Sequence, residues 1–464
     1  MKTQYFAKHA AWIFTCGVLS LLCFNLVFAQ SLSDDFITIT SENVGQLELG
    51  YILPGFCGTT DSSQELTALW NVGVFDLLTG KQRFEIKSDY GDFSPLGNYF
   101  AAAEDGVINS HTGLQLIKAG SGFFSPDEKY FAARGNGVYE LATGKRLFTI
   151  RATGWFSPNN QLIAVDSDAI YEIKTGKKVF TLPNGIVTFS PDSKYFGVWE
   201  HGIFETATGK QIIVSSGVIP DFSPDSQYAS MDDDGVYNLK TRKRIINLKP
   251  NASFSFSPDA KSIAVAGDGL YDLATGKRQF KISGDQDVAP AYFGGSRWMT
   301  VHNDGIYDLS TNEKAFDTVG FVFSATENGS LVTISRKGIF ETATGQLKFR
   351  IDDSRFAAHD KLVISLIWTL DAPNSTFCAV YGVKGDKWPY RSGLVDTSHT
   401  QLYDVPNGEK RLDAQGRPLT TSKQQAVFAQ TADKKWLRVA DTSWVKTSEI
   451  KPISLPDGIS VENP

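Results

Sequence analysis

The chain has 464 residues, a formal net charge of −6 and 12% aromatic residues. This length exceeds what one ordinary hydrophobic core covers and suits a large domain followed by a smaller one. The acidic balance, with no concentrated basic stretch, excludes the electrostatic footprint of a nucleic-acid-binding protein. Forty-one glycines and only three methionines favour a turn-rich all-β protein over a helical bundle.

Residues 1–29 are typical of a secretory signal peptide. Lys2 and Lys8 precede an apolar run over residues 10–28, and Val27-Phe28-Ala29 offers a cleavage site before Gln30. We therefore expect a secreted, periplasmic or cell-envelope protein. The alternative is an uncleaved membrane anchor, because the apolar run is close to the length that spans a bilayer.

A motif repeats nine times between residues 73 and 345, at a step of about 33 residues. Its clearest copy is Gly137–Lys145, with the sequence Gly-Val-Tyr-Glu-Leu-Ala-Thr-Gly-Lys. A second motif, Phe-Ser-Pro followed by Asp in all copies but one, alternates with it and begins at Phe124, Phe156, Phe189, Phe222 and Phe256. A fixed period of this size indicates one supersecondary unit stacked on copies of itself. We expect these five phenylalanines to be buried.

Each repeat is predicted to contain four short antiparallel strands. In the third copy these are residues 130–133, 138–141, 146–150 and 154–156, joined by tight turns. An Asn-Gly or Asp-Gly pair precedes the second strand, which predicts a nearly two-residue hairpin with positive φ at glycine. Repeated four-stranded units of this kind indicate the blades of a β-propeller.

The repeat resembles that of the bacterial WD-repeat propellers, over residues 40–370. The resemblance implies eight to ten blades, with the segment Glu42–Leu53 lending a strand to the last blade and closing the ring. An open superhelical solenoid is the alternative. The Val-Tyr-x-Leu-x-Thr-Gly-Lys strand is also similar to quinoprotein-type propeller repeats, but phenylalanine stands where those repeats have tryptophan, so we expect no cofactor.

The same resemblance implies that the Ser-Pro-Asp and Thr-Gly-Lys turns share one face of the ring. Lysines and aspartates would then gather there, and we expect a solvated, mixed-charge face rather than an anion-binding site. The opposite face, with its short hairpins, is expected to be nearly bare. The residues concerned are Lys81, Lys145, Lys177, Lys210 and Lys277, with Asp127, Asp192, Asp225 and Asp259.

Residues 375–452 form a second module. A tryptophan strand at Lys435–Ala440 and a final Trp-Val segment at residues 444–445 resemble the bacterial Src-homology-3-like (SH3-like) barrel, whose members often bind cell-wall peptides or other extracellular ligands. We expect Trp436 to pack inside, and Trp388 and Tyr390, which stand among charged residues, to face solvent and bind the ligand.

No catalytic, metal-binding or cofactor-binding motif emerges from the sequence. We therefore predict a non-enzymatic binding or scaffold protein, whose partner is an extracellular or cell-envelope protein or peptidoglycan and not a nucleic acid. The alternative is an extracellular propeller enzyme, a lyase or cofactor-dependent oxidoreductase, with its site in the central channel. A closed ring would bring Cys57 and Cys378 together, and we expect a disulfide between them.

Overall fold

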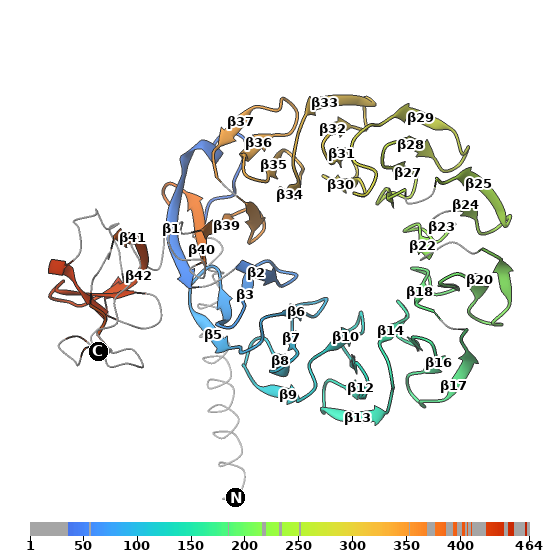
Figure 1. The fold of residues 1–464 in the computed structure, drawn as a ribbon, viewed down its shortest axis with the longest axis horizontal. Helices are drawn as coiled ribbons and strands as arrows, with labels where there is room; N and C mark the ends of the chain where they lie inside the picture. The colour runs from blue at the N-terminus through green and yellow to red at the C-terminus, as the bar shows by residue number, and fades with distance from the viewer. Residues whose placement is uncertain are drawn as a thin grey trace, which may run out of the picture.

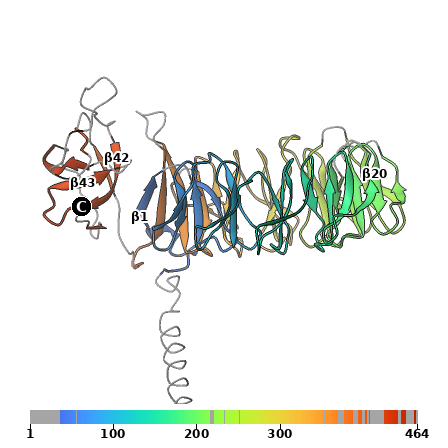
Figure 2. The same ribbon diagram turned by 90° about the horizontal axis from the view of Figure 1, so that it is seen from below.

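The computed structural model describes residues 36–54, 57–183, 185–215, 220–231, 234–249, 252–351, 353–368, 376–386, 393–396, 401–403, 406, 410, 424–439, 444–449 and 460–461. Within this part of the chain, ten four-stranded antiparallel sheets stand side by side in a ring (Figure 1). Seen from the edge, the strands run between two flat faces (Figure 2). The protein therefore contains a ten-bladed β-propeller, within the range of eight to ten expected from the sequence.

Every blade has the same radial order of strands. The innermost strands are β2 (Cys57–Thr60), β6 (Gly91–Phe93), β10 (Gly122–Phe124), β14 (Gly154–Phe156), β18 (Val187–Phe189), β22 (Pro220–Phe222), β26 (Phe254–Phe256), β30 (Ala291–Phe293), β34 (Val322–Ala325) and β38 (Ser354–Ala357). The second strands are β3 (Leu66–Leu69), β7 (Tyr99–Ala102), β11 (Tyr130–Ala133), β15 (Leu162–Val165), β19 (Tyr195–Val198), β23 (Tyr228–Met231), β27 (Ser262–Val265), β31 (Trp298–Val301), β35 (Leu331–Ile334) and β39 (Leu362–Trp368).

The two outer positions complete each blade. The third strands are β4 (Gly73–Asp76), β8 (Gly106–Asn109), β12 (Gly137–Glu140), β16 (Ala169–Glu172), β20 (Gly202–Glu205), β24 (Gly235–Asn238), β28 (Gly269–Asp272), β32 (Gly305–Asp308), β36 (Gly338–Glu341) and β40 (Thr376–Val383). The outermost strands are β5 (Gln82–Glu85), β9 (Gln115–Ile117), β13 (Lys145–Phe148), β17 (Lys178–Thr181), β21 (Gln211–Ile213), β25 (Lys243–Asn247), β29 (Arg278–Lys281), β33 (Glu313–Asp317), β37 (Leu347–Phe349) and β1 (Leu47–Pro54). We number the blades 1 to 9 from β2–β5 to β34–β37, and call the tenth, which contains β38–β40 and β1, the closing blade.

The blade boundary differs from the one read in the sequence. The strand at Gly154–Phe156 was expected to end the third repeat, but it pairs with β15 and is therefore the innermost strand of blade 4. The Phe-Ser-Pro-Asp motif thus spans the turn between the innermost and second strands of one blade, and the chain crosses to the next blade just before it.

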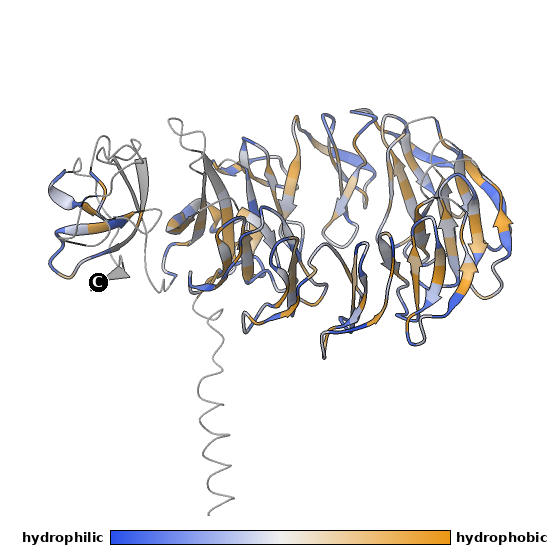
Figure 3. Cartoon of the chain, turned by 60° about the horizontal axis from the view of Figure 1, so that its bottom comes forward, coloured by the Kyte–Doolittle hydropathy of each residue, from blue (hydrophilic) through white to orange (hydrophobic). Residues whose placement is uncertain are grey.

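The hydrophobic core lies between neighbouring blades. A typical cluster joins Ala132 and Val138 of blade 3 to Ile163 and Val165 of blade 4. Hydrophobic residues accordingly follow the strands, whereas the turns at both faces are mostly hydrophilic (Figure 3). Each blade covers one side of the next, so the ring stabilises itself only as a stack of repeats.

Burial of the motif phenylalanines was predicted correctly in part. Phe189, Phe222 and Phe256 are buried, but Phe124 and Phe156 are only half-buried. All five lie at the end of an innermost strand, where one edge of the blade has no further strand beside it, and even the three buried ones keep 6–9% exposure. Fully buried phenylalanines occur instead on the second strands, for example Phe100 and Phe131.

The ring closes through the N-terminal strand, as the sequence predicted. β1 pairs antiparallel with β40, with Leu53 opposite Cys378, and a short 3-10 helix, η2 (Val44–Gln46), precedes it. The closing blade also contacts blade 1 through β39 and β2, and blade 9 through β38 and β34. The open solenoid is therefore wrong. The predicted end of the propeller at residue 370 is also too early, because β40 continues the closing blade to Val383.

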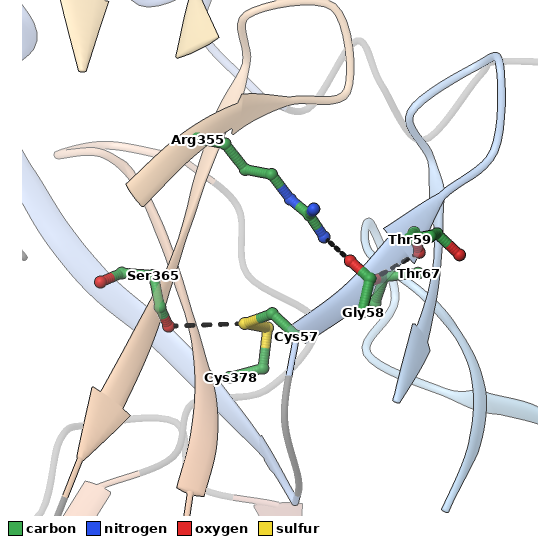
Figure 4. Close-up of a disulfide and its surroundings, with 7 residues drawn as sticks. All are labelled: Cys57, Gly58, Thr59, Thr67, Arg355, Ser365 and Cys378. Carbon is green, nitrogen blue, oxygen red and sulfur yellow. Dashed lines mark hydrogen bonds between the residues drawn. A yellow bond between two sulfur atoms is a disulfide. The ribbon is translucent and has the colours of Figure 1, made fainter. Parts of the chain in front are cut away.

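A disulfide joins the two ends of the propeller. Cys57 on β2 is bonded to Cys378 on β40, with their Cα atoms 5.0 Å apart (Figure 4). The Cys57 sulfur also lies 3.6 Å from the carbonyl oxygen of Ser365, a packing contact because a disulfide sulfur carries no proton to donate. Nearby, the Arg355 guanidinium donates a hydrogen bond to the Gly58 carbonyl (Figure 4). Blade 1 and the closing blade are thus linked covalently and by hydrogen bonding.

The hairpins between second and third strands differ from the predicted ones. They have three residues rather than two, as at residues 134–136 between β11 and β12. In blade 3 the positive φ belongs to Gly135 (φ 65°) and not to Gly137, whereas Gly106 (φ 79°) and Gly202 (φ 97°) have the positive φ that was predicted. Gly137 is required for another reason, because a Cβ atom there would lie 2.6 Å from the carbonyl oxygen of Phe148 on the neighbouring strand.

The C-terminal residues form a separate five-stranded sheet outside the ring, with β42 lying beside β1 (Figures 1 and 2). Trp436 is buried, as predicted, and packs edge-on against Tyr403 at 5.0 Å between ring centroids. Its elements are β41 (Gly393–Asp396), β42 (Gln424–Gln430), β43 (Trp436–Val439), β44 (Trp444–Lys446), the 3-10 helix η4 (Thr447–Glu449) and β45 (Ser460–Val461), which pairs parallel to β42.

Two predictions fall outside the described residues: the signal peptide at 1–29, and the ligand-binding pair Trp388 and Tyr390. Within the described part of the chain, no helix has both the length and the apolar character needed to cross a lipid bilayer.

Candidate binding face of the propeller

The order of the strands gives the ring two chemically different faces. In each antiparallel blade, the turns after the innermost and the third strands lie on one face, which carries the Ser-Pro-Asp and Thr-Gly-Lys turns. We call it the Ser-Pro face, and its composition is as predicted. The hairpins after the second strands and the connections between blades lie on the other face, which we call the hairpin face.

On the Ser-Pro face, the aspartates serve the turns themselves. The Ser190 hydroxyl donates to Asp192 at 2.8 Å and accepts from the backbone N–H of Tyr195 at 3.0 Å. Asp192 also accepts from the backbone N–H of Lys194. Burial raises the pKa of Asp192, but these hydrogen bonds outweigh burial and lower it overall. The turn lysines are all exposed, as expected for a solvated face: Lys81, Lys145, Lys177, Lys210 and Lys277.

On the hairpin face, the aspartate of each Asp-Gly pair is also structural. Asp234 accepts hydrogen bonds from Tyr237 at 2.7 Å and Arg244 at 2.6 Å. The tyrosine is three residues and the basic residue ten residues further on, and the same spacing recurs in other blades. Other examples are Asn136, Tyr139 and Arg146; Asp168, Tyr171 and Lys178; and Asp304, Tyr307 and Lys314. This repeated spacing is visible in the sequence and was overlooked there.

The hairpins leave the hairpin face without long loops, as predicted, but aromatic pairs join neighbouring blades on this face and on the innermost strands beside it. Phe123 of β10 and Trp155 of β14 lie 4.2 Å apart between ring centroids, tilted by 31°, and Phe123 remains 41% exposed. The indole N–H of Trp155 donates to both carboxylate oxygens of Asp166, at 3.0 and 3.2 Å. Burial raises the pKa of Asp166, while Trp155, a backbone N–H and the charge of Arg134 oppose the shift.

A second pair spans blades 1 and 2. Trp70 follows β3 and Tyr90 precedes β6, with their ring centroids 6.5 Å apart. Tyr90 is 60% exposed, and its hydroxyl donates to Asp92 at 2.6 Å. As in the first pair, a carboxylate fixes the orientation of one ring of the pair.

A third pair spans blades 8 and 9. His302 stacks on Phe321 at 4.0 Å between ring centroids, and its Nδ1 lies 2.7 Å from Asp285, which also accepts from the Asn303 amide. Phe321 is 49% exposed. Two residues later, Phe323 is left unpaired by a register shift in β34 and is 52% exposed; such bulges re-aim side chains next to functional sites.

These aromatic residues were missed in the sequence, although a signal was present. The position before the motif phenylalanine is polar in most repeats, as with Asp92, Thr188 and Asp221, but is Phe123 in blade 3 and Trp155 in blade 4. A departure from the repeat at an innermost strand therefore indicated a specialised surface.

The hairpin face combines flat apolar rings with carboxylates that hold them in place. Among the described residues, no three His, Cys, Asp or Glu side chains come together as a metal site. The exposed or half-exposed charged residues of the innermost strands, Asp92, Asp221 and Arg355, belong to blade 2, blade 6 and the closing blade, so they do not converge.

No protein-family model and no curated protein matches the chain in sequence. Among solved structures, the eukaryotic initiation factor matches with a TM-score of 0.42 and 13% identity, over 59% of this chain and 91% of that one. The β-propeller domain of Myceliophteria thermophila Cps50 (Swd1) matches with a TM-score of 0.29 and 12% identity, over 73% of this chain and 100% of that one. Chaetomium thermophilum Sqt1 matches with a TM-score of 0.31 and 14% identity, over 68% and 88%. The ten sheets, and not these similarities, define the fold.

Proposed function

We propose that this is a secreted, non-catalytic binding protein that holds an extracellular macromolecule on the hairpin face of its propeller. The observation that carries the proposal is the set of three aromatic pairs on that face or on the innermost strands beside it, each spanning two blades and each containing a strongly exposed ring. Exposed aromatic surface on a rigid scaffold marks interaction sites. The three-residue hairpins around it leave little chain from which to build a deep catalytic pocket.

The alternative of an extracellular propeller enzyme needs titratable groups that converge on one point. Asp221 on blade 6 lies four blades away from Asp92 on blade 2 and from Arg355 on the closing blade, and this separation favours binding over catalysis. Secretion is supported by the targeting pattern of residues 1–29 and by the disulfide, because disulfides persist in oxidising compartments.

The C-terminal module is proposed to be an SH3-like barrel that adds a second contact, with peptidoglycan or another cell-envelope component. Its small core around Tyr403, Trp436 and Trp444 supports a compact fold. Trp388 and Tyr390 are proposed to bind the ligand. Replacing both with alanine should abolish retention on purified cell wall and leave the melting temperature nearly unchanged; unaltered retention would contradict their role.

The role of the hairpin face is tested by capture from the native cell envelope. A variant with Tyr90→Ala, Phe123→Ala and Phe321→Ala should lose the captured component. The matched control carries Leu96→Ala, Leu114→Ala and Lys145→Ala, three exposed positions on the Ser-Pro face, and should capture as the wild type does. Equal capture by both variants would show that the hairpin face is not the binding surface.

A further inference from the structure

We propose that the hairpin face binds a chain of neutral, β-linked pyranose sugars, with the three aromatic pairs as separate sugar subsites. This inference rests on the proposed function and names its ligand class. In β-1,4-linked glucose and N-acetylglucosamine the ring substituents are equatorial, so the axial C–H bonds form flat apolar faces that match the face of an aromatic ring. The hydroxyl groups at the rim of each sugar donate and accept hydrogen bonds.

The pair of Phe123 and Trp155 has the parts that such a ligand needs. The two rings stack on each other at 4.2 Å between centroids, and Phe123 remains 41% exposed, so part of its apolar surface is left for a ligand at the inner edge of the ring. Asp166 holds the indole of Trp155 in place, so little side-chain entropy is lost on binding. The carboxylate of Asp166 and the nearby exposed guanidinium of Arg134 add an acceptor and a donor beside that surface.

The other two pairs repeat this composition. Tyr90 has Asp92 at 2.6 Å, and the stack of His302 and Phe321 has Asp285 at 2.7 Å from His302. Each subsite therefore combines an exposed aromatic ring with a carboxylate, which accepts hydrogen bonds but donates none. A sugar hydroxyl is a suitable donor to such a group.

The spacing of the pairs favours a repeating chain over a protein partner. The pairs lie on blades 1 and 2, 3 and 4, and 8 and 9, so they form separate platforms. A stable protein interface has a continuous apolar centre from which charged residues are depleted, whereas here a carboxylate accompanies every aromatic pair. A polymer of identical units can occupy several separate, similar subsites, and each added contact raises the overall affinity.

A polyanionic chain fits the face less well. The three carboxylates and the net charge of −6 repel phosphate-bearing or sulfated polymers. The proposed ligand is therefore neutral, whether it is free in the medium or part of a cell wall.

The test uses the full mature chain, with cellohexaose and chitohexaose as soluble probes and purified cell wall as the insoluble one. Intrinsic tryptophan fluorescence and calorimetry should show saturable binding of at least one hexaose. Phe123→Ala should weaken that binding by about tenfold, equivalent to about 1.4 kcal/mol. Lys145→Ala, on the opposite face, should leave it unchanged.

A second substitution controls for the possibility that Phe123→Ala weakens binding through misfolding. Trp155→Phe keeps an aromatic ring but removes the indole N–H, so it should retain part of the affinity, while the circular dichroism spectrum stays that of the wild type. If neither hexaose nor cell wall binds, but the hairpin-face variant still loses a captured envelope protein, the sugar ligand is wrong and the proposed function stands. If neither sugar nor protein depends on the hairpin face, both proposals are wrong.

Discussion

Cys57 and Cys378 are 321 residues apart in the sequence and are joined by a disulfide between blade 1 and the closing blade. The same closing blade takes its outermost strand, β1, from the N-terminal side and its other three strands from residues 354–383. The ring is therefore sealed twice, by a strand that leaves no open edge and by a covalent bond beside it. An open ring would expose the cores of blade 1 and blade 9.

Removing the disulfide should lower the stability of the whole ring. Replacing Cys57 and Cys378 with serine is expected to reduce the free energy of unfolding by about 2–5 kcal/mol, because the unfolded chain gains the freedom that a long closed loop denies it. Chemical denaturation followed by circular dichroism measures the effect. A reducing agent should shift the wild type to the same midpoint and leave the double variant unaffected. An unchanged midpoint in the variant would show that β1 pairing alone holds the ring.

The aspartate of the Asp-Tyr-Arg motif should make stability depend on acid pH. Burial raises the pKa of Asp234, but hydrogen bonds from Ser215, Tyr237 and Arg244 outweigh it and hold the pKa below the ordinary value of 3.8. A carboxyl with a lowered folded-state pKa stabilises the protein above its unfolded pKa, and this contribution is lost as the pH falls through the folded pKa.

Asp234→Asn should therefore be less stable than the wild type by about 1–3 kcal/mol at neutral pH. The difference should shrink below about pH 4, where the aspartate of the wild type begins to take up a proton. Thermal melting from pH 7 to pH 2.5 measures both curves. Parallel curves over the whole range would contradict a charged role for Asp234. Tyr237→Phe leaves the ion pair between Asp234 and Arg244 in place. It should therefore reduce the stability, and the pH dependence of the stability, by less than Asp234→Asn does.

The serine of the Ser-Pro-Asp turn should matter more than the turn lysine. The Ser190 side chain is buried, and its hydroxyl accepts a hydrogen bond from the backbone N–H of Tyr195 at 3.0 Å. Ser190→Ala leaves this donor without its acceptor and should cost about 1–3 kcal/mol. Lys145→Ala, at an exposed turn position, should change stability by less than about 0.5 kcal/mol. Urea denaturation of the two variants measures both changes in stability. Equal changes would mean that backbone hydrogen bonds alone hold the turn.

The two glycines of the third-blade hairpin should respond differently to substitution. Gly137 faces the carbonyl of Phe148, so Gly137→Ala should cost about 1–3 kcal/mol through overpacking. Gly135 has a positive φ but open surroundings, and the corresponding hairpin of blade 8 has Asn303 with φ 57°. Gly135→Asn should therefore stay within about 0.5 kcal/mol of the wild type. The denaturation midpoints of both variants measure these effects. A large loss of stability in Gly135→Asn would contradict the view that this position needs only a positive φ.

Much of the fold can be predicted from the sequence because each blade is built from local contacts. The alternation of buried and exposed residues and the turn residues at Gly144 and Pro126 lie within one repeat of about 33 residues. The lead-in strand and the pairing of Cys57 with Cys378 also follow once the ring is assumed to close. The blade boundary and the hairpin glycines were misread, since strand pairing and the close approach at Gly137 depend on the register between strands.

Only the tertiary structure decided which segments pair across the ring and which side chains of neighbouring blades come into contact. β40 has no repeat motif, and it becomes the third strand of the closing blade through pairing with β1, more than 320 residues away. The contact of Phe123 with Trp155 likewise depends on the distance between two adjacent blades, which the curvature of a ten-membered ring sets. Local hydrogen bonds and the two-residue period shape a blade, whereas packing between blades determines how many blades the ring has and which aromatic side chains of neighbouring blades meet.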